Sequence, residues 1–586
     1  MTGKPAFLGV EHSLTGRRWT GPAPETERAA EAIVQATDLP RPVALVLAER
    51  GVPPHEARAF LDPKLRDLLP DPTLLRDMDK AAARLARAIA RKERIALFTD
   101  YDVDGAASAA QLIDFLRPFG ITPTLYVPDR IDEGYGPNPA AMADLASRHE
   151  LILTLDCGTL AHEALAAARA ADVVVIDHHQ GGETPPPAHA VVNPNRQDED
   201  GALGHLAAAG VVFLFLVRVR RLLLEAGHGH APDLLPFLDL VALATVADVV
   251  PLVGVNRAFV RQGLKVMARR ARPGLAALAD AAGLNEPPDA WHLGFVLGPR
   301  INAGGRIGKA DLGTRLLATR DRAEAEAIAA RLEALNAERR EIEARIRAEA
   351  ESAIEAKGAT DGPLVWAAGE GWHPGVLGIV AARIKERFNR PSVVLADDGT
   401  TATGSARSVA GIDIGAAIAR LAHEGLILKG GGHRMAAGLT VESGRLEAAM
   451  ARLGALLARQ GSAMLGPGEL RVSGIVLPGA ASPELVEEIA RAGPFGAAAP
   501  APRFVLPAAA ILDARPMGET HLRLRAGEGG NSLDIVAFGA FDSALGQTLV
   551  TRRGERFHLL GRLEIDNWGG RRKVRLRLED AAPAHD

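Results

Sequence analysis

The chain has 586 residues, of which 47% are hydrophobic and 24% charged, and its formal net charge at pH 7 is −4. Single cores rarely grow past ~250–300 residues, so this length predicts several domains. The charge gives no global basic signal, so any contact with nucleic acid must come from local patches. Cys157 is the only cysteine, which excludes an intrachain disulfide. The longest bulky apolar run, Val211 to Val217, is too short to cross a bilayer, so we expect a cytoplasmic protein.

Residues 1–75 carry short helical patterns that prolines interrupt, such as Pro54 to Leu61. They offer no recognisable chemistry, and we expect a helical lead-in that packs on the domain that follows. That domain spans residues 76–319 and begins with a helix at about Ala81 to Arg91.

Three carboxylates in this domain, Asp100, Asp156 and Asp177, each come directly after a short apolar run. Alanine-rich segments with helical periodicity separate the runs. Apolar strands that alternate with helices predict a parallel sheet covered on both faces. In such sheets ligands bind outside the carboxyl ends of the strands, so we expect the three acids to converge on one crevice.

The acids near these strand ends predict a metal site. Asp100 and Asp102 are two residues apart and can point to the same side. Carboxylates with one or two imidazoles suit two Mn²⁺ or Mg²⁺ ions, which would clamp a phosphoryl group and activate a water. The alternative is that each acid is only a helix cap or turn residue, which describes any one of them better than the whole set. The set comprises Asp100, Asp102, Asp156, Asp177, His178 and Asp248.

Three neighbouring residues receive structural interpretations. Asp104 could coordinate a metal, but we expect it equally to cap the helix that begins at Gly105. His179 is expected to make a supporting hydrogen bond rather than to bind metal directly. Cys157 is expected to be a small packed residue beside Asp156.

The remaining chain predicts three further parts. Residues 320–357 contain no proline or glycine and predict one long amphipathic connector helix, with a coiled-coil dimer as the alternative. Residues 358–460 predict a second, smaller α/β domain. Residues 465–586 contain alternating runs separated by glycine-rich turns, which predict a small β-barrel.

Several glycine-containing segments, which we expect to be loops, carry groups suited to phosphate oxygens. Each of these residues alone could equally be an ordinary surface or structural side chain, and the Gly430–Gly432 run could be a plain turn. The candidates are Arg130, Arg300, Arg306, Ser405, Arg407 and His433.

In the predicted barrel, basic residues alternate with apolar ones and aromatic residues lie nearby in sequence. A basic face with aromatic platforms is how small barrels hold single strands, and the alternative is a solvated strand face with core aromatics. The residues are Arg523, Arg525, Arg571, Arg572, Lys573, Arg575 and Arg577, with Phe538, Phe541, Phe557 and Trp568.

The segments that begin at Asp100, Asp156 and Asp177 resemble the signature of the DHH phosphoesterase superfamily. Those at 298–306, 405–408 and 430–438 are similar to the RecJ family within it. The resemblance covers nearly the whole chain except about the first 75 residues. It implies a DHH lobe and a DHHA1 lobe joined by a long helix and followed by an OB-fold. It also implies an exonuclease that degrades single-stranded DNA from the 5′ end.

Residue by residue, the resemblance implies metal ligation by Asp100, Asp102, Asp156, His178 and Asp248, with Asp156 as the bridge between two ions. Further catalytic roles are expected for Asp177 and His179. The residues that match the family's 5′-phosphate pocket are Arg130, Ser405 and Arg407, with Arg306 or Arg300, and further substrate contacts are expected from Asn302 and His433. Pyrophosphatases of the superfamily carry a histidine where this chain has Ala96, which favours the RecJ family.

The resemblance, together with the predicted metal site, therefore implies a metal-dependent exonuclease that acts in DNA recombination and repair and releases mononucleotides. One alternative is a DHH phosphodiesterase for cyclic dinucleotides or nanoRNA, although such members lack a basic OB-fold. The other is a catalytically inactive scaffold, against which the complete set of motif acids argues. The resemblance further implies a monomer that works with single-strand-binding protein and a RecQ-type helicase.

Overall fold

The computed structural model describes residues 5–584 except 131, 230, 359, 466–467, 542 and 567–571. The chain forms two compact units, one made of Leu68–Leu465 and the other of Met1–Asp67 together with Gly466–Asp586. The expectation that the N-terminal lead-in packs on the following domain is therefore wrong for residues 5–67, which pack in the unit of the C-terminal barrel, whereas residues 68–75 belong to the same unit as that domain. Among the described residues, no helix is both long and apolar enough to span a membrane.

The first lobe of the larger unit contains a five-stranded sheet, and all of its strand pairs are parallel. Thr99, Leu155 and Ile176 are paired across three neighbouring strands, so the acids that follow them emerge side by side. This register confirms the predicted parallel sheet. Its strands, in spatial order, are β3 (Thr124–Tyr126), β2 (Ile95–Thr99), β4 (Leu151–Leu155), β5 (Asp172–Ile176) and β6 (Ala190–Val192).

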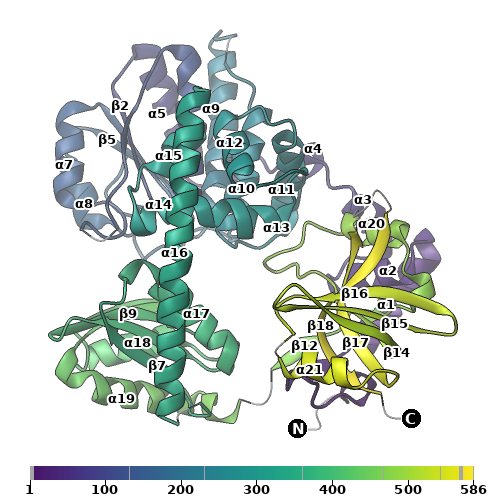
Figure 1. The fold of residues 1–586 in the computed structure, drawn as a ribbon. Coiled ribbons are helices and arrows are strands. Elements are labelled where there is room, and N and C mark those ends of the chain that lie inside the picture. The colour runs from purple at the N-terminus through teal and green to yellow at the C-terminus, as the bar shows by residue number, and fades with distance from the viewer. Residues whose placement is uncertain are drawn as a thin grey trace. The chain divides into compact units, whose positions relative to one another are not determined.

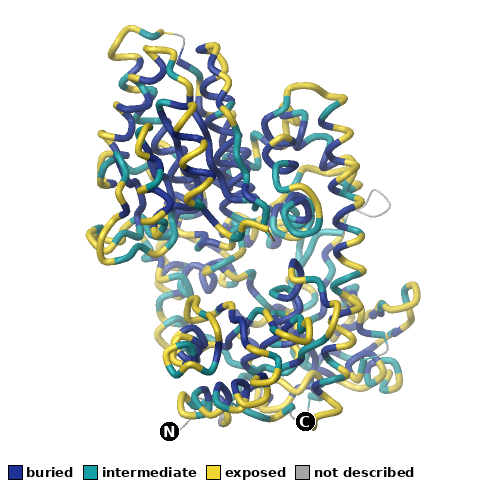
Figure 2. The backbone as a smooth tube through the Cα atoms, turned by 90° about the vertical axis from the view of Figure 1, so that its left-hand side faces the viewer, coloured by how far each residue is buried: buried dark blue, intermediate teal, exposed yellow. Residues whose placement is uncertain are grey.

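Helices cover this sheet, and the buried residues run through the centre of the lobe (Figures 1 and 2). Residues 298–306, predicted as a loop, form a helix instead. This helix continues without a break from the preceding helical turns, and Pro299 lies in its first turn. The helices are α5 (Met78–Arg91), α6 (Val103–Leu116), α7 (Pro139–Arg148), α8 (His162–Ala167), α9 (Ala208–Glu225), α10 (Leu238–Ala247), α11 (Gly254–Met267), α12 (Pro273–Ala281), α13 (Ala290–His292), α14 (Gly298–Ile307) and α15 (Leu312–Ala318).

The predicted connector is the single helix α16 (Arg322–Ala356), the long helix in Figure 1. Ile328, Leu332 and Leu335 join the core of the first lobe, whereas Ile346 and Ile354 join the core of the second. The apolar positions that could have formed a coiled-coil seam are thus used inside the chain. This favours the intramolecular connector over the dimer helix.

The second lobe has a mixed five-stranded sheet in the order β10-β11-β9-β8-β7. Two segments predicted as loops are strands here, since Ser405 and Arg407 lie on β9 and Gly430–Gly432 on β10. The many glycines and small polar residues concealed their alternation. The elements are β7 (Val365–Glu370), β8 (Ser392–Asp397), β9 (Thr401–Arg407), β10 (Lys429–His433), β11 (Ala436–Glu442), α17 (Leu377–Phe388), α18 (Ile414–His423) and α19 (Leu446–Arg459).

The smaller unit contains a closed five-stranded barrel, because β14 pairs with β17 as well as with β15. The predicted strand at 470–477 divides in two, with β12 pairing with β1 and β13 with β14. Trp568 and Arg571 lie outside the described residues. The elements are β12 (Glu469–Arg471), β13 (Gly474–Ile475), α20 (Pro483–Arg491), β14 (Phe504–Met517), β15 (His521–Glu528), β16 (Asn531–Ala537), α21 (Ala544–Thr551), β17 (Arg556–Asp566) and β18 (Lys573–Pro583).

The N-terminal segment is tied to this barrel by a strand and by a buried indole. The indole N–H of Trp19, on β1 (Arg18–Thr20), donates a hydrogen bond of 2.9 Å to Asp580 on β18. Helices of the segment share a core with Ile489 and Phe504 of the barrel unit. These helices are α1 (Pro24–Thr37), α2 (Arg41–Glu49) and α3 (Ala57–Leu61), and α4 (Leu65–Leu68) lies at the junction of the two units.

Candidate metal centre

The first acidic motif joins the end of β2 to the start of α6. Asp102 caps α6, because its carboxylate accepts hydrogen bonds from the backbone N–H groups of Asp104 and Gly105 at 2.8 and 3.2 Å. A Cβ atom on Gly105 would lie 2.5 Å from the backbone oxygen of Asp100, so only glycine allows this tight turn. The turn therefore places Asp100 and Asp102 together at the strand end.

Asp104 does not cap the helix that contains it, which corrects one sequence-based expectation. Its two carboxylate oxygens accept hydrogen bonds of 2.7 Å from the backbone N–H groups of Ala208 and Ala209, at the start of α9. This fully buried side chain thus holds α9 against α6. It also lies 3.7 Å from Nε2 of His178, at the edge of the acidic cluster.

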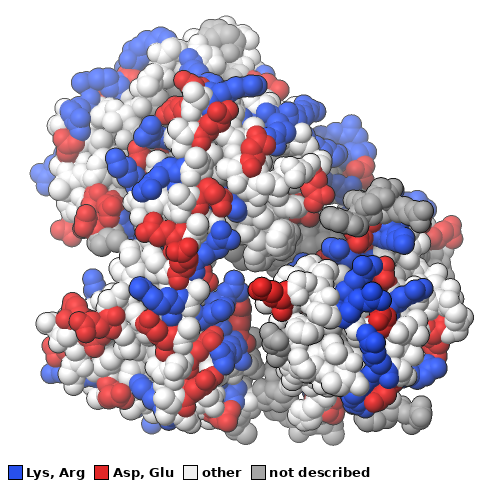
Figure 3. All heavy atoms as spheres, in the orientation of Figure 1, with Lys and Arg blue, Asp and Glu red and all other residues white. Residues whose placement is uncertain are grey.

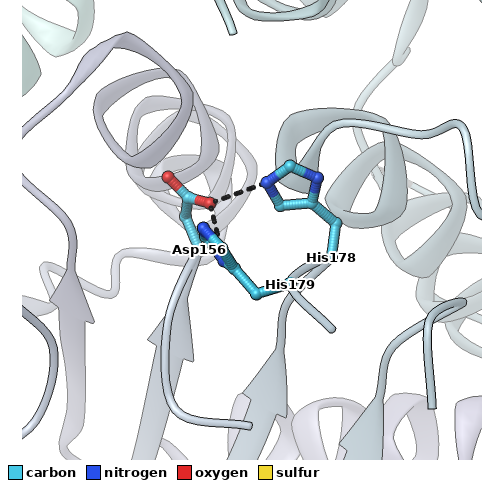
Figure 4. A group of neighbouring side chains, drawn as sticks. All are labelled: Asp156, His178 and His179. Carbon is cyan, nitrogen blue, oxygen red and sulfur yellow. Dashed lines mark ion pairs between the residues drawn. The ribbon is translucent and has the colours of Figure 1, made fainter. Parts of the chain in front are cut away.

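His178 is the point at which the acids converge. Its Nε2 lies 3.3 Å from Asp156 and 3.5 Å from Asp248, whereas its Nδ1 lies 3.1 Å from the backbone oxygen of Leu206. A carbonyl can only accept, so Nδ1 carries a proton, and a neutral ring then has its lone pair on Nε2. In Figure 4 the rings of His178 and His179 both approach the same carboxylate oxygen of Asp156.

Three overlapping groups of side chains have ligand atoms within 4.8 Å of one another. Asp156 belongs to two of them, as expected for a bridging carboxylate. One oxygen each of Asp100 and Asp156, together with Nε2 of His178, is buried and has no hydrogen-bond partner among the described residues. Carboxylates and one or two imidazoles are ligands for Mg²⁺ and Mn²⁺, so these orphaned atoms fit such ions. The groups are Asp100–Asp102–Asp156, Asp104–His178–Asp248 and Asp156–His178–His179.

The acids of the cluster destabilise one another when no cation is present. Burial, and then repulsion from neighbouring carboxylates, raises the pKa of Asp100, Asp156 and Asp248 well above the usual value for aspartate. Asp156 also has a φ of +60°, a left-handed conformation that is uncommon for residues other than glycine. Strain and buried like charge at a strand end are typical of functional sites.

The sequence position of Asp177 placed it in the predicted metal site, but its carboxylate instead accepts hydrogen bonds within the neighbouring loops. It accepts hydrogen bonds from the backbone N–H groups of Thr159, His178 and His179 and from Nδ1 of His179, at 2.7–3.2 Å. Burial alone would raise the pKa of Asp177, but the hydrogen bond and charge of His179 hold it below the usual range. Asp177 therefore shapes the loop that presents the two histidines.

His179 makes the supporting hydrogen bond that was expected, at 2.8 Å to Asp177. Burial by itself lowers the pKa of the imidazole, yet the bond to Asp177 outweighs this and raises it. The hydroxyl of Tyr135 lies 3.1 Å from Nδ1 of His179 and donates a hydrogen bond of 2.9 Å to the backbone oxygen of Asp156. Asp177 therefore favours the protonated form of His179 beside the cluster.

Sequence reasoning gave no role to Tyr135, Asn193 or Asn195. The amide of Asn193 donates to Thr159 and to the backbone oxygen of His179, and that of Asn195 donates to the backbone oxygen of His178. Asn193 follows β6 at the same level at which the acids follow β2, β4 and β5. The sequence signal that could have identified Asn193 is its position directly after a fourth short apolar run.

Three of the predicted phosphate-binding arginines lie together. Arg130 stacks over the ring of Tyr101 at 5.1 Å, Arg306 donates to the backbone oxygen of Gly375, and Arg407 donates to the hydroxyl of Ser405. Burial, followed by the charge of Arg130, lowers the pKa of Arg306 to about 10 and also lowers that of Arg407. Within the described chain, none of the three has a carboxylate within 4.0 Å.

The other predicted contacts are arranged differently. Arg300 pairs with Glu333 on α16 and donates to the backbone oxygen of Val296, so its charge is already neutralised. Asn302 accepts from the backbone N–H of Val103 at 3.0 Å and thereby supports the start of α6. His433 is exposed at the end of β10. Arg306, rather than Arg300, therefore completes the arginine cluster.

Comparisons with known proteins agree with this arrangement. The models for the "DHH family, N-terminal domain", the "DHHA1 domain" and the "RecJ OB domain" match residues 94–245, 361–459 and 473–580. A curated relative from Dickeya dadantii, named single-stranded-DNA-specific exonuclease RecJ, is 39% identical over 568 residues, which are 93% of this chain and 96% of the relative. The chain belongs to the RecJ family.

Solved structures of a RecJ from Thermus thermophilus support the same assignment. The structure with Mn²⁺ is 31% identical, with a TM-score of 0.80, and covers 96% of this chain and 79% of that one. The structure with Mg²⁺ is 29% identical, with a TM-score of 0.74 and coverages of 97% and 79%. The RecJ-family resemblance and the architecture of DHH lobe, DHHA1 lobe and OB-fold are thus confirmed, whereas the individual site residues stay predictions.

Proposed function

We propose that this RecJ-family chain is a metal-dependent exonuclease that degrades single-stranded DNA from the 5′ end to mononucleotides. The observation that carries the proposal is that an acidic cluster with orphaned ligand atoms is accompanied by an arginine cluster that has no carboxylate partner among the described residues. The first suits cations and the second suits a terminal phosphate. The names of the relatives, and the ions in the titles of the Thermus structures, support the same activity.

Five residues would hold two Mn²⁺ or Mg²⁺ ions. When bound, such ions lower the pKa of a water molecule and stabilise the charge that develops on a phosphoryl group. Asp156 would bridge the ions, and Nε2 of His178 would face them because Leu206 fixes its ring. The residues are Asp100, Asp102, Asp156, His178 and Asp248.

The second histidine would contribute its own charge to the reaction. Asp177 favours the protonated form of His179, Tyr135 lies within hydrogen-bond distance of its ring, and 39% of its side chain is exposed. Its imidazolium can donate a hydrogen bond to the scissile phosphate, where negative charge increases in the transition state. Asp177 and Tyr135 would act as positioning residues for this group.

The arginine cluster supports the 5′ polarity. A terminal phosphate carries more charge than an internal one, so Arg130, Arg306 and Arg407, with Ser405, would prefer a strand end. A Cβ atom on Gly378 would lie 2.8 Å from the guanidinium of Arg407, so the first turn of α17 packs directly against it. The start of a helix adds further attraction for an anion.

The barrel would hold the strand through one face. Arg523, Val536, Arg577 and Arg562 are paired in succession across β15, β16, β18 and β17, and the three arginines are not buried. Phe538 is exposed beside this row, with Arg577 5.3 Å from its ring centre. In Figure 3, lysine and arginine side chains gather over this barrel. A basic row beside an aromatic ring suits a single strand.

The decisive experiment digests one strand labelled at the 5′ end and the same strand labelled at the 3′ end, each with and without Mn²⁺, beside the duplex. Immediate release of the 5′ label as mononucleotide, only with metal and only from the single strand, is the expected result. First release of the 3′ label would overturn the polarity. Cleavage of dinucleotides alone would favour the small-substrate phosphodiesterase, and no cleavage would favour the scaffold.

We also propose a cytoplasmic location and a monomeric enzyme that works with single-strand-binding protein and a RecQ-type helicase in recombination and repair. The family resemblance supports these partners. Size measurement by light scattering, followed by pull-down with each purified partner, tests the proposal. A stable dimer, or the absence of either association, would contradict the corresponding part.

A further inference from the structure

Two large aromatic side chains are exposed beside each other near the candidate metal centre. Trp291 is 47% exposed and Phe295 is 64% exposed. Their ring centres are 5.7 Å apart and their planes are inclined by 23°, so the rings are stacked. Isolated exposed apolar residues are ordinary, but adjacent large ones mark interaction sites.

The helix that carries these rings is unusual. α13, the π-helical segment η6 (Leu293–Leu297) and α14 follow one another with right-handed helical backbone at each junction. Leu293, Leu297 and Ile301 are buried on one side and fix the helix in the core. Trp291 and Phe295 are left on the outer side. π-Helical segments are rare and occur frequently at functional sites.

This helix lies directly beside the metal-centre residues. A Cβ atom on Gly298 would lie 3.1 Å from Cβ of Ala247, the last residue of α10, which Asp248 follows. Asp248 retains 24% side-chain exposure, whereas Asp156 retains 3%. Val249 follows it and is 70% exposed at a φ of +60°, a strained conformation for a β-branched residue. The centre is thus open to solvent beside the end of α10.

The same helix reaches the arginine cluster at its other end. Arg306 lies eleven residues after Phe295, which corresponds to about 16 Å along a helix. A stacked single strand advances about 3.4 Å per nucleotide, so this length matches roughly five nucleotides. A strand whose 5′ phosphate lies at Arg306 can therefore place a base near Phe295.

We propose that Trp291 and Phe295 form a base-stacking platform for the single strand on the 3′ side of the scissile bond. The inference rests on the proposed nuclease function and adds a specificity-determining contact to it. Flat, already stacked rings at the side of the site suit nucleobases, because every base offers a stacking face. A paired duplex buries these faces between its own base pairs, so the platform selects unpaired strands.

The test uses the full chain with Mn²⁺ and compares Phe295→Ala, Phe295→Trp and Leu235→Ala. Leu235 is 54% exposed in the same lobe and serves as the matched control. Substrates are a 5′-phosphorylated dinucleotide, a strand of about twelve nucleotides, and the same strand with an abasic residue at about the fifth position.

We expect Phe295→Ala to raise KM for the long strand by about fivefold to a hundredfold and to leave the dinucleotide unchanged. The loss should shrink on the abasic strand, because the base that would stack is absent. Phe295→Trp should restore KM, and Leu235→Ala should behave as wild type. Equal losses on the dinucleotide and the long strand would overturn the platform in favour of a structural role.

An unchanged KM in Phe295→Ala would also overturn the proposal and assign the rings to a protein partner or a second copy of the chain. The failure of the proposed nuclease function looks different, since the wild-type chain would then release no mononucleotide from any substrate. Binding of the long strand measured by fluorescence anisotropy gives a second readout that does not depend on cleavage.

Discussion

His178 donates its Nδ1–H to the backbone oxygen of Leu206, 3.1 Å away, and the bond turns Nε2 of the ring toward the carboxylates of Asp156 and Asp248. A lone pair that faces buried carboxylates is unfavourable unless a cation lies between them. One backbone hydrogen bond at the start of α9 therefore prepares an imidazole for metal. The same arrangement makes the metal-free protein sensitive to each charge in the cluster.

Asp156→Asn should separate activity from stability. We expect exonuclease activity to fall by about a thousandfold or more, because the bridging carboxylate is lost. In EDTA, Tm should rise by roughly 2 °C or more, because a repelled buried charge is removed. Asparagine tolerates the left-handed backbone at this position, which alanine would strain. A fall in Tm in EDTA, measured by calorimetry, would contradict the repulsion.

Without metal, the protein should become less stable as pH rises, which is the opposite of the effect of an aspartate whose pKa is lowered by folding. Asp100, Asp156 and Asp248 have raised pKa values, so stability that is fully present when they are protonated is lost as pH rises through those values. We therefore expect Tm in EDTA to decrease as pH rises above the ordinary pKa of aspartate. Excess Mn²⁺ should reverse the trend, because metal ligands must be deprotonated and binding tightens with pH. A Tm that is flat with pH in EDTA would contradict this expectation.

Asp177→Asn should act through His179. The negative charge of Asp177 raises the pKa of His179, so its removal should shift the loss of activity at alkaline pH to lower pH. We expect kcat at neutral pH to fall by about tenfold to a hundredfold while KM changes little. A pH–rate profile checks both effects. An unshifted profile with a uniform loss would point to a misfolded loop, because Asp177 also binds three backbone N–H groups.

Arg407→Ala and Arg300→Ala form a matched pair. Arg407 has no carboxylate partner among the described residues, so its loss should remove about tenfold or more of the preference for a 5′-phosphorylated over a 5′-hydroxyl strand. Arg300 is neutralised by Glu333, so its loss should leave that preference intact and instead lower Tm. Competition between the two strands measures the preference. Equal effects of both variants would remove Arg407 from the proposed pocket.

The sheet of the first lobe could be predicted because its apolar runs are short, continuous and followed by acids. Asp100, Asp156 and Asp177 were correctly expected at one sheet edge, since parallel strands share a direction. The different use of Asp177 could not be predicted. Whether a carboxylate faces a cavity or three backbone N–H groups depends on the path of the loop after Asp156, which the spacing of residues does not record.

The remaining errors also have physical reasons. The strand at Gly430 is rich in glycine and the strand at Ser405 consists mostly of small residues, which removes the alternation on which strand prediction depends. Glycines likewise hid the helical periodicity of the segment that begins at Gly298. The pairing of β1 with β12 joins residues more than 400 positions apart, and no local pattern encodes such a contact. Asp104 behaves similarly, because its partners lie on a helix about 100 residues later.

The arginine row of the barrel gives a prediction about salt. Each arginine that contacts a phosphate of a single strand contributes about 0.7 to the slope of log K against log salt concentration. We expect Arg577→Ala to reduce that slope by about this amount and to weaken binding of a long strand without changing cleavage of a dinucleotide. Arg552→Ala, at the C-terminal end of α21 and outside the row of arginines, is the control that should leave the slope unchanged. Anisotropy titrations at several salt concentrations provide both slopes. Equal slopes for wild type and Arg577→Ala would mean that this face of the barrel does not hold the strand.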